Sequence, residues 1–138
     1  MKKRNIFISL IAGLMIAMML VGCGAPKTLE GYMNTPGAQQ ELEKQLVSVK
    51  AMYASVFKDV DILFNDNTVT YVYTFKNAVS QDEWDSTYET SAKSDFEKAA
   101  PSGIDQQRQI TNIKDPITFV FIYKSSDGTE LAKYSLTK

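Results

Sequence analysis

Acidic side chains are the groups in this chain best suited to catalysis. Four of them fall in one short stretch, Asp82, Glu83, Asp85 and Glu89. A hydrolase that cleaves glycosides would need two carboxyls about 5 to 9 Å apart in a cleft. The same residues suit the start of a helix, where negative charge complements the helix dipole. We favour this second interpretation, and a small hydrolase using paired carboxylates is the alternative.

The absence of histidine limits the remaining chemistry. The chain has no histidine and one cysteine, so it lacks the usual general base, the usual zinc ligand and both Ser/His and Cys/His nucleophile pairs. The Asn/Asp-rich turns at 65–67 and 127–130 do not supply the spaced run of ligands that a calcium loop requires. We therefore expect no enzyme activity, no catalytic residue, no metal site and no cofactor.

Cys23 is the only cysteine, and the residues before it give it a chemical role. A basic start at residues 2–4 leads into an apolar run at 6–21, and Gly22 precedes Cys23. The run is shorter than the roughly 20 apolar residues that a transmembrane helix needs. This pattern resembles a bacterial lipoprotein signal peptide, in which residues 1–22 are removed and the Cys23 thiol receives a diacylglyceryl group. The alternative is an uncleaved N-terminal anchor in which Cys23 is incidental.

Lipidation at Cys23 would set both the location and the domain boundaries. Two acyl chains anchor a protein stably, so we expect it at the outer face of the bacterial cytoplasmic membrane, with the membrane as a partner. Residues 23–27 would be the lipidated cysteine and a short tether, and residues 28–138 a single domain. The chain after residue 22 keeps 12 of the 15 basic residues and all 16 acidic ones. This negative balance disfavours nucleic acid as a partner.

Two stretches have helical periodicity. Apolar residues at steps of three and four within 38–56 predict an amphipathic helix. Ser80 and Glu83 form a capping box that starts a second helix. Proline and glycine at 101–103 are expected to end this helix, with a further short helical piece at 104–113.

Two pairs of segments have the alternation of β-strands. The pair 60–64 and 69–75 and the pair 117–123 and 132–136 are each joined by a turn, so each predicts a β-hairpin. The order favours an α+β domain with one four-stranded antiparallel sheet. We expect this sheet to consist of the two hairpins, with amphipathic helices packed on one face, in the order α-β-β-α-β-β.

The predicted strands place aromatic residues on one phase and threonine or aliphatic residues on the other. If the aromatic face packs on the helices, the other face meets solvent. The residues of this possible binding face are Thr68, Thr70, Val72, Thr74, Thr118, Val120 and Ile122. Contiguous exposed apolar area tends to mark a binding site. The alternative is an ordinary solvent-exposed face, because β-branched residues favour β-strands whether or not the face binds a ligand.

Several segments also carry a resemblance to a known family. They are residues 28–32 after the cysteine, 67–75 in the first hairpin, and Tyr123 with 127–128 in the last. In their order and spacing the chain resembles the small lipoproteins of Gram-positive bacteria catalogued as domain-of-unknown-function family 4854. The resemblance implies a fold and a location but no activity. We therefore expect a lipid-anchored surface module that binds a protein, peptide or cell-wall component. A paired-carboxylate hydrolase, or a structural or chaperone-like envelope protein, is the alternative.

Overall fold

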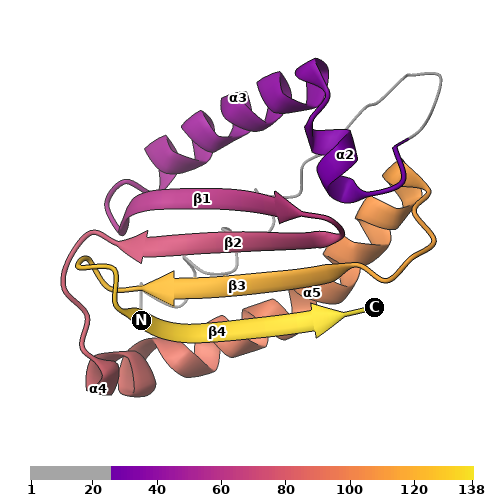
Figure 1. Cartoon of the computed structure of the whole chain (residues 1–138). Helices are drawn as coiled ribbons and strands as arrows, with labels where there is room; N and C mark the ends of the chain where they lie inside the picture. The colour runs from indigo at the N-terminus through magenta and orange to yellow at the C-terminus, as the bar shows by residue number, and fades with distance from the viewer. Residues whose placement is uncertain (1–25) are drawn as a thin grey trace.

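The computed structural model describes residues 26–138, so the predicted signal segment and Cys23 lie outside the described residues. In chain order the elements are α2 (Leu29–Met33), α3 (Pro36–Met52), β1 (Phe57–Asn65), β2 (Thr68–Phe75), α4 (Gln81–Glu83), η1 (Trp84–Tyr88), α5 (Glu89–Thr111), β3 (Thr118–Lys124) and β4 (Glu130–Thr137) (Figure 1). The element η1 is a π-helical turn between α4 and α5. Among residues 26–138, no helix combines the length and the apolar composition needed to span a bilayer.

The four strands form one mixed sheet in the order β1-β2-β3-β4. The predicted hairpins are confirmed, because β1 pairs antiparallel with β2 and β3 pairs antiparallel with β4. The prediction that the whole sheet is antiparallel is wrong, because β2 and β3 run parallel (Figure 1). Parallel neighbours require a long crossover connection. The helical segment from α4 to α5 provides it, returning the chain from the end of β2 to the start of β3.

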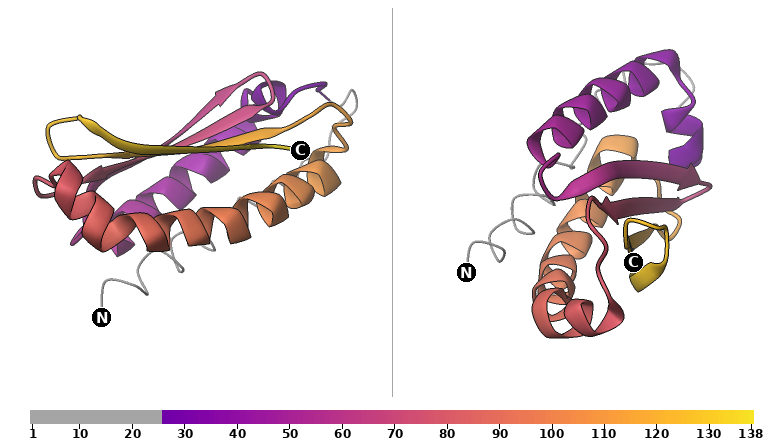
Figure 2. Two further views of the ribbon diagram at one scale, coloured as in Figure 1. Left: turned by 90° about the horizontal axis from the view of Figure 1, so that it is seen from below. Right: turned by 90° about the vertical axis from the view of Figure 1, so that its left-hand side faces the viewer.

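The helices α3 and α5 lie on the same side of the sheet (Figure 2). Residues of β2 are alternately buried and half-buried along the whole strand, as expected for a sheet covered on one face. The covered face is aromatic. The Tyr73 ring stacks on the Tyr123 ring with centroids 5.0 Å apart, and Trp84 packs on Tyr123 at 4.9 Å. Ring contacts of this kind stabilise the core beyond the area that they bury.

The second predicted helix begins as expected but does not end as expected. The Ser80 side chain accepts a hydrogen bond from the Glu83 backbone N–H at 3.1 Å, as in a capping box. The prediction that the helix ends at 101–103 is wrong, because α5 continues through Pro101 to Thr111. Proline removes one helical hydrogen bond, but Ala100 and Ile104 on either side of it are fully buried. Burial of this face against the sheet outweighs the local cost, and the expected separate helical piece at 104–113 is part of α5.

The short helix α2 is fixed at one end of the sheet. The Glu30 backbone N–H donates to the Asp66 carbonyl at 2.9 Å, and the Asp66 N–H donates to the Glu30 carboxylate at 2.7 Å. On the other side, the Tyr32 hydroxyl donates to the Thr111 carbonyl at 2.8 Å. The start of the described chain is therefore tied both to the β1–β2 turn and to the last residue of α5.

Candidate functional site

The predicted binding face is the side of the sheet turned away from α3 and α5. Strand pairing arranges it in two neighbouring rows that cross all four strands. One row is Leu63, Thr70, Val120 and Ser135, and the other is Asp61, Val72, Ile122 and Lys133. We call these eight residues the open-face patch. Of the predicted face residues, Thr70, Val72, Val120 and Ile122 form its centre, whereas Thr68, Thr74 and Thr118 lie around it on the same face.

The centre of the open-face patch is apolar. Leu63 on β1 is 52% exposed, which makes it one of the few large apolar side chains left largely uncovered within residues 26–138. Val120 on β3 is only 7% exposed but does not belong to the core under the helices. Val72 and Ile122 are half-buried. The patch therefore offers a shallow apolar strip bordered by threonine and serine hydroxyls.

Leu63 is a further residue of this face, and it was not among the residues predicted for it. It lies two residues after Asp61, on the exposed phase of β1, whereas the buried Val60 and Ile62 are on the other phase. The alternation of side chains along β1 indicated that Leu63 faces away from the helices. Its apolar side chain suggested the opposite, because an apolar residue on a strand covered on one face usually points into the core.

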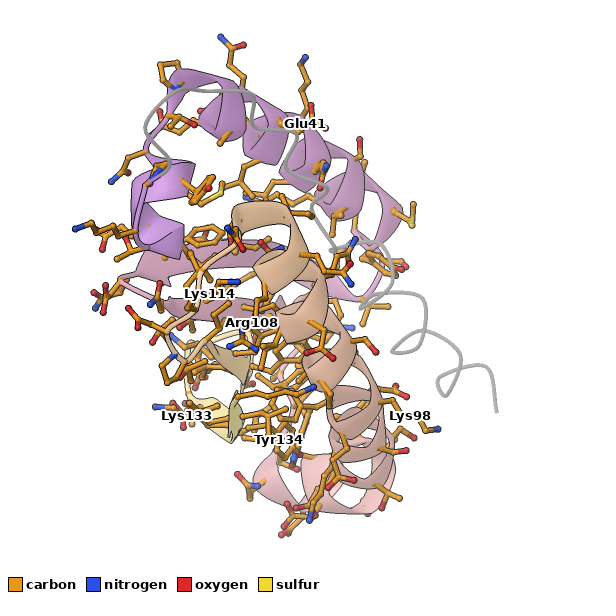
Figure 3. The ribbon with its side chains drawn as sticks, turned by 90° about the vertical axis from the view of Figure 1, so that its right-hand side faces the viewer. Glu41, Lys98, Arg108, Lys114, Lys133 and Tyr134 are labelled. Atoms are coloured by element: carbon orange, nitrogen blue, oxygen red, sulfur yellow. The ribbon has the colours of Figure 1, made fainter. Side chains whose placement is uncertain are left out.

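Opposite charges flank the apolar strip. Asp61 on β1 and Lys133 on β4 stand at the two ends of the same row. Asp59, also on the open side of β1, pairs with Lys50 of α3 at 2.9 Å, and both partners are largely exposed. Lys133 projects from the sheet edge in Figure 3. A ligand lying across the strands would therefore meet an acidic edge on β1 and a basic edge on β4.

Two hydroxyls on this face are hydrogen-bonded to each other. The Thr118 and Thr137 hydroxyl oxygens lie 2.8 Å apart and form a hydrogen bond between β3 and β4. This contact stabilises the edge of the sheet at the end where α2 docks. Thr118 is therefore the predicted face residue whose hydroxyl contributes to the domain's own structure.

The acidic stretch considered for hydrolysis lies at the start of the second helical segment. Asp82, Asp85 and Glu89 are exposed, and Glu83 is half-buried. The Gln81 side-chain amide donates to Asp85 at 2.8 Å. Within residues 26–138, no group of three or more Asp, Glu, His or Cys side chains is placed to hold a metal ion.

The described residues form a small α+β domain with a mixed four-stranded sheet. Helices cover one face of this sheet, and no helix of residues 26–138 covers the other. The chain belongs to the family described as domain of unknown function DUF4854, whose pattern matches residues 29–136. This match covers α2 and all four strands except the last residue of β4. Neither the curated proteins nor the solved structures contain a match to the chain.

Proposed function

We propose that this protein is a lipid-anchored, non-enzymatic binding module on the outer face of the cytoplasmic membrane of a Gram-positive bacterium. Its open-face patch would bind a protein, a peptide or a cell-wall component. The observation that carries this proposal is the apolar strip of Leu63, Val72 and Ile122 on a sheet face that no helix of residues 26–138 covers. Exposed apolar area bordered by polar groups is typical of interaction surfaces.

Lipidation at Cys23 would also set the orientation of the domain relative to the membrane. Cys23 precedes Pro26 by three residues, which span at most about 11 Å. Because α2 is hydrogen-bonded to the β1–β2 turn, this end of the sheet would lie next to the membrane. The strands would then extend outward from the bilayer. The open-face patch would face sideways into the wall layer, where a partner can reach it without approaching the lipid surface.

Anchoring is tested by replacing Cys23 with alanine. Cells that express the full chain are fed a labelled fatty acid, and the label and the membrane-bound fraction are measured. We expect the native chain to take up the label and Cys23→Ala to lose both the label and the stable membrane association. Equal labelling of the two proteins would refute lipidation at Cys23.

Binding is tested by site-specific photo-cross-linking in the same cells. A photoreactive residue is placed at Leu63 in the patch, and at Gln109, which is exposed on α5, as the control. We expect discrete adducts from position 63 but not from position 109, and we expect Val72→Lys to abolish them while the domain stays folded. Identical adduct patterns from the two positions, or adducts that persist in Val72→Lys, would argue against this face as the binding surface.

A further inference from the structure

The two ends of one row of the open-face patch carry opposite charges. Asp61 on β1 and Lys133 on β4 are the ends of the row that crosses the sheet through Val72 and Ile122. Neither end forms a salt bridge with any residue in 26–138. Three strand spacings of about 4.8 Å separate them, which is too far for these two side chains to meet. A surface with an acidic end, an apolar middle and a basic end is complementary to a second copy of itself turned by 180°.

A two-fold axis that runs along the strands brings these charges together when two open faces pack on each other. Under this rotation β1 of one copy lies over β4 of the other, so Asp61 of each copy faces Lys133 of the other. Because β2 lies over β3, Val72 of each copy packs on Ile122 of the other. An axis that runs across the strands would instead place Asp61 of one copy against Asp61 of the other, and like charges across an interface are unfavourable. The charges therefore select the axis along the strands.

The anchor proposed at Cys23 selects the same axis. In the orientation that we propose, the strands extend outward from the bilayer and the α2 end of the sheet lies next to it. A two-fold axis along the strands is then parallel to the membrane normal, so the α2 ends of both copies lie at the same bilayer. An axis across the strands would turn the α2 end of one copy, and with it one anchor, away from the membrane.

We propose that the partner of the open-face patch is a second copy of this chain in the same membrane, and that the two open faces pack as a β-sandwich. The inference rests on the binding role proposed for the patch and names its partner. Four strands about 4.8 Å apart and seven residues long, the length of β3, present about 19 by 23 Å, so two copies would bury on the order of 900 Å². Interfaces of this size are typical of weak complexes, and confinement to one membrane favours them by raising the effective concentration.

The rows on either side of the open-face patch are compatible with this packing. At the α2 end, Thr118 and Thr137 are uncharged. At the other end, Asp59 of one copy would approach Glu130 of the other, because both lie in the row next to the patch. Asp59 is already paired with Lys50 at 2.9 Å, which offsets this approach of like charges.

Cross-linking in cells that express two differently tagged copies of the full chain tests this inference. A photoreactive residue at Leu63, which would face Ser135 of the second copy, is compared with one at Gln109 on α5. We expect an adduct from position 63 that carries both tags and has twice the mass of the chain, and no such adduct from position 109. Adducts from position 63 that never carry the second tag would overturn the dimer but leave the proposed binding role standing. The absence of any adduct from position 63 would refute both.

Reversing the charges tests the geometry of the pairing. Asp61→Lys or Lys133→Glu alone places like charges opposite each other at both ends of the row, and should reduce the two-tag adduct by about tenfold or more. When one tagged chain carries Asp61→Lys and the other Lys133→Glu, opposite charges face each other again, and the adduct should return to near the native level. The controls Glu97→Lys and Lys98→Glu change the net charge by the same amounts at exposed positions of α5, and should leave the adduct unchanged. Native adduct levels in both single variants, or no recovery on co-expression, would overturn the proposal.

Discussion

Replacing Asp95 with asparagine should change how the stability of this domain depends on pH. Burial raises the pKa of Asp95 above its ordinary value of 3.8, and the positive charge of Lys98 opposes this only in part. The Tyr123 hydroxyl interacts with this carboxyl, and burial raises the pKa of Tyr123 as well. This hydroxyl remains neutral through the acidic and neutral range, so Asp95 is the group that titrates there.

The direction of the pH dependence of stability follows from how tightly the folded and the unfolded chain bind the Asp95 proton. Because the folded protein holds the Asp95 proton more tightly than the unfolded chain, protonated Asp95 favours the folded state. This contribution is fully present below pH 3.8 and is lost as the pH rises through the higher folded pKa. At neutral pH the native chain must therefore bury a charge that Asp95→Asn does not carry. Below pH 3.8 both side chains are neutral, and the difference should nearly vanish.

The size of the effect follows from the missing partner. A buried polar atom left without a hydrogen bond costs about 1 to 3 kcal/mol, and asparagine relieves the charge but not the whole of this cost. We therefore expect Asp95→Asn to raise the free energy of unfolding by about 1 kcal/mol at neutral pH. For a domain of this length, that is a rise of about 4 °C or more in Tm.

Urea unfolding of both proteins at about pH 3.5 and about pH 7.5 measures this difference. Glu97→Gln is the control, because it removes one negative charge from an exposed position on the same helix. It corrects for the change in net charge and should leave the pH dependence as in the native chain. Parallel stability curves for the native chain and Asp95→Asn, or a less stable Asp95→Asn at neutral pH, would refute the reasoning.

Further substitutions test the contacts that hold the fold. Tyr32→Phe removes the hydrogen bond to the buried Thr111 carbonyl and should cost about 1 to 3 kcal/mol in urea unfolding; an unchanged midpoint would show that this bond does not fix α2. Gly128→Ala and Gly37→Ala form a matched pair, because a Cβ at either position meets no atom within 4 Å. Gly128 has φ +90°, so alanine there should destabilise by about 1 kcal/mol, whereas alanine at Gly37 in α3 should stabilise by up to about 1 kcal/mol. Calorimetry that gives both the same sign would contradict the backbone argument.

The hairpins and the start of the second helical segment could be predicted from the sequence. The way in which the two hairpins pair with each other could not. Both hairpins are marked by alternation on either side of a turn, and Ser80 marks the start of the second helical segment. Each hairpin is a local unit, so its pattern does not say which strand of the other hairpin lies beside it. The parallel pairing of β2 with β3 depends on the path of the α5 crossover, which no local pattern encodes.

The same limit explains the error at Pro101. The rule that proline ends a helix describes a local cost of about 3 kcal/mol. In this fold, Ala100 before Pro101 and Ile104 one turn after Ala100 are buried in the core, and buried residues recur along the whole length of α5. The sequence shows the proline and therefore its cost to the helix, but it does not show the tertiary packing that offsets this cost. The helical spacing from Ile104 onward was the signal that the helix continues.

The sequence reveals the open-face patch more clearly than the burial of Asp95. The alternation in β2 and β3 predicted which residues face away from the helices, because a period of two assigns every side chain to one face. Asp95 gave a weaker signal. It lies three residues after the buried Ala92, beside the apolar stripe of α5, where an acidic residue is usually solvent-exposed. Its burial depends on the packing of α5 against the sheet, which no local pattern encodes.

Because neighbouring residues of β2 face opposite sides, adjacent substitutions can separate the open-face patch from the covered face. Val72→Lys should abolish cross-linking from position 63 while the domain stays folded, since Val72 lies on the open phase. Tyr73→Phe should leave the adducts unchanged, because it removes a hydroxyl on the covered phase and leaves the open-face patch intact. Loss of the adducts in folded Tyr73→Phe would mean that the two faces do not act independently. Adducts that persist in Val72→Lys would mean that β2 does not carry the binding surface.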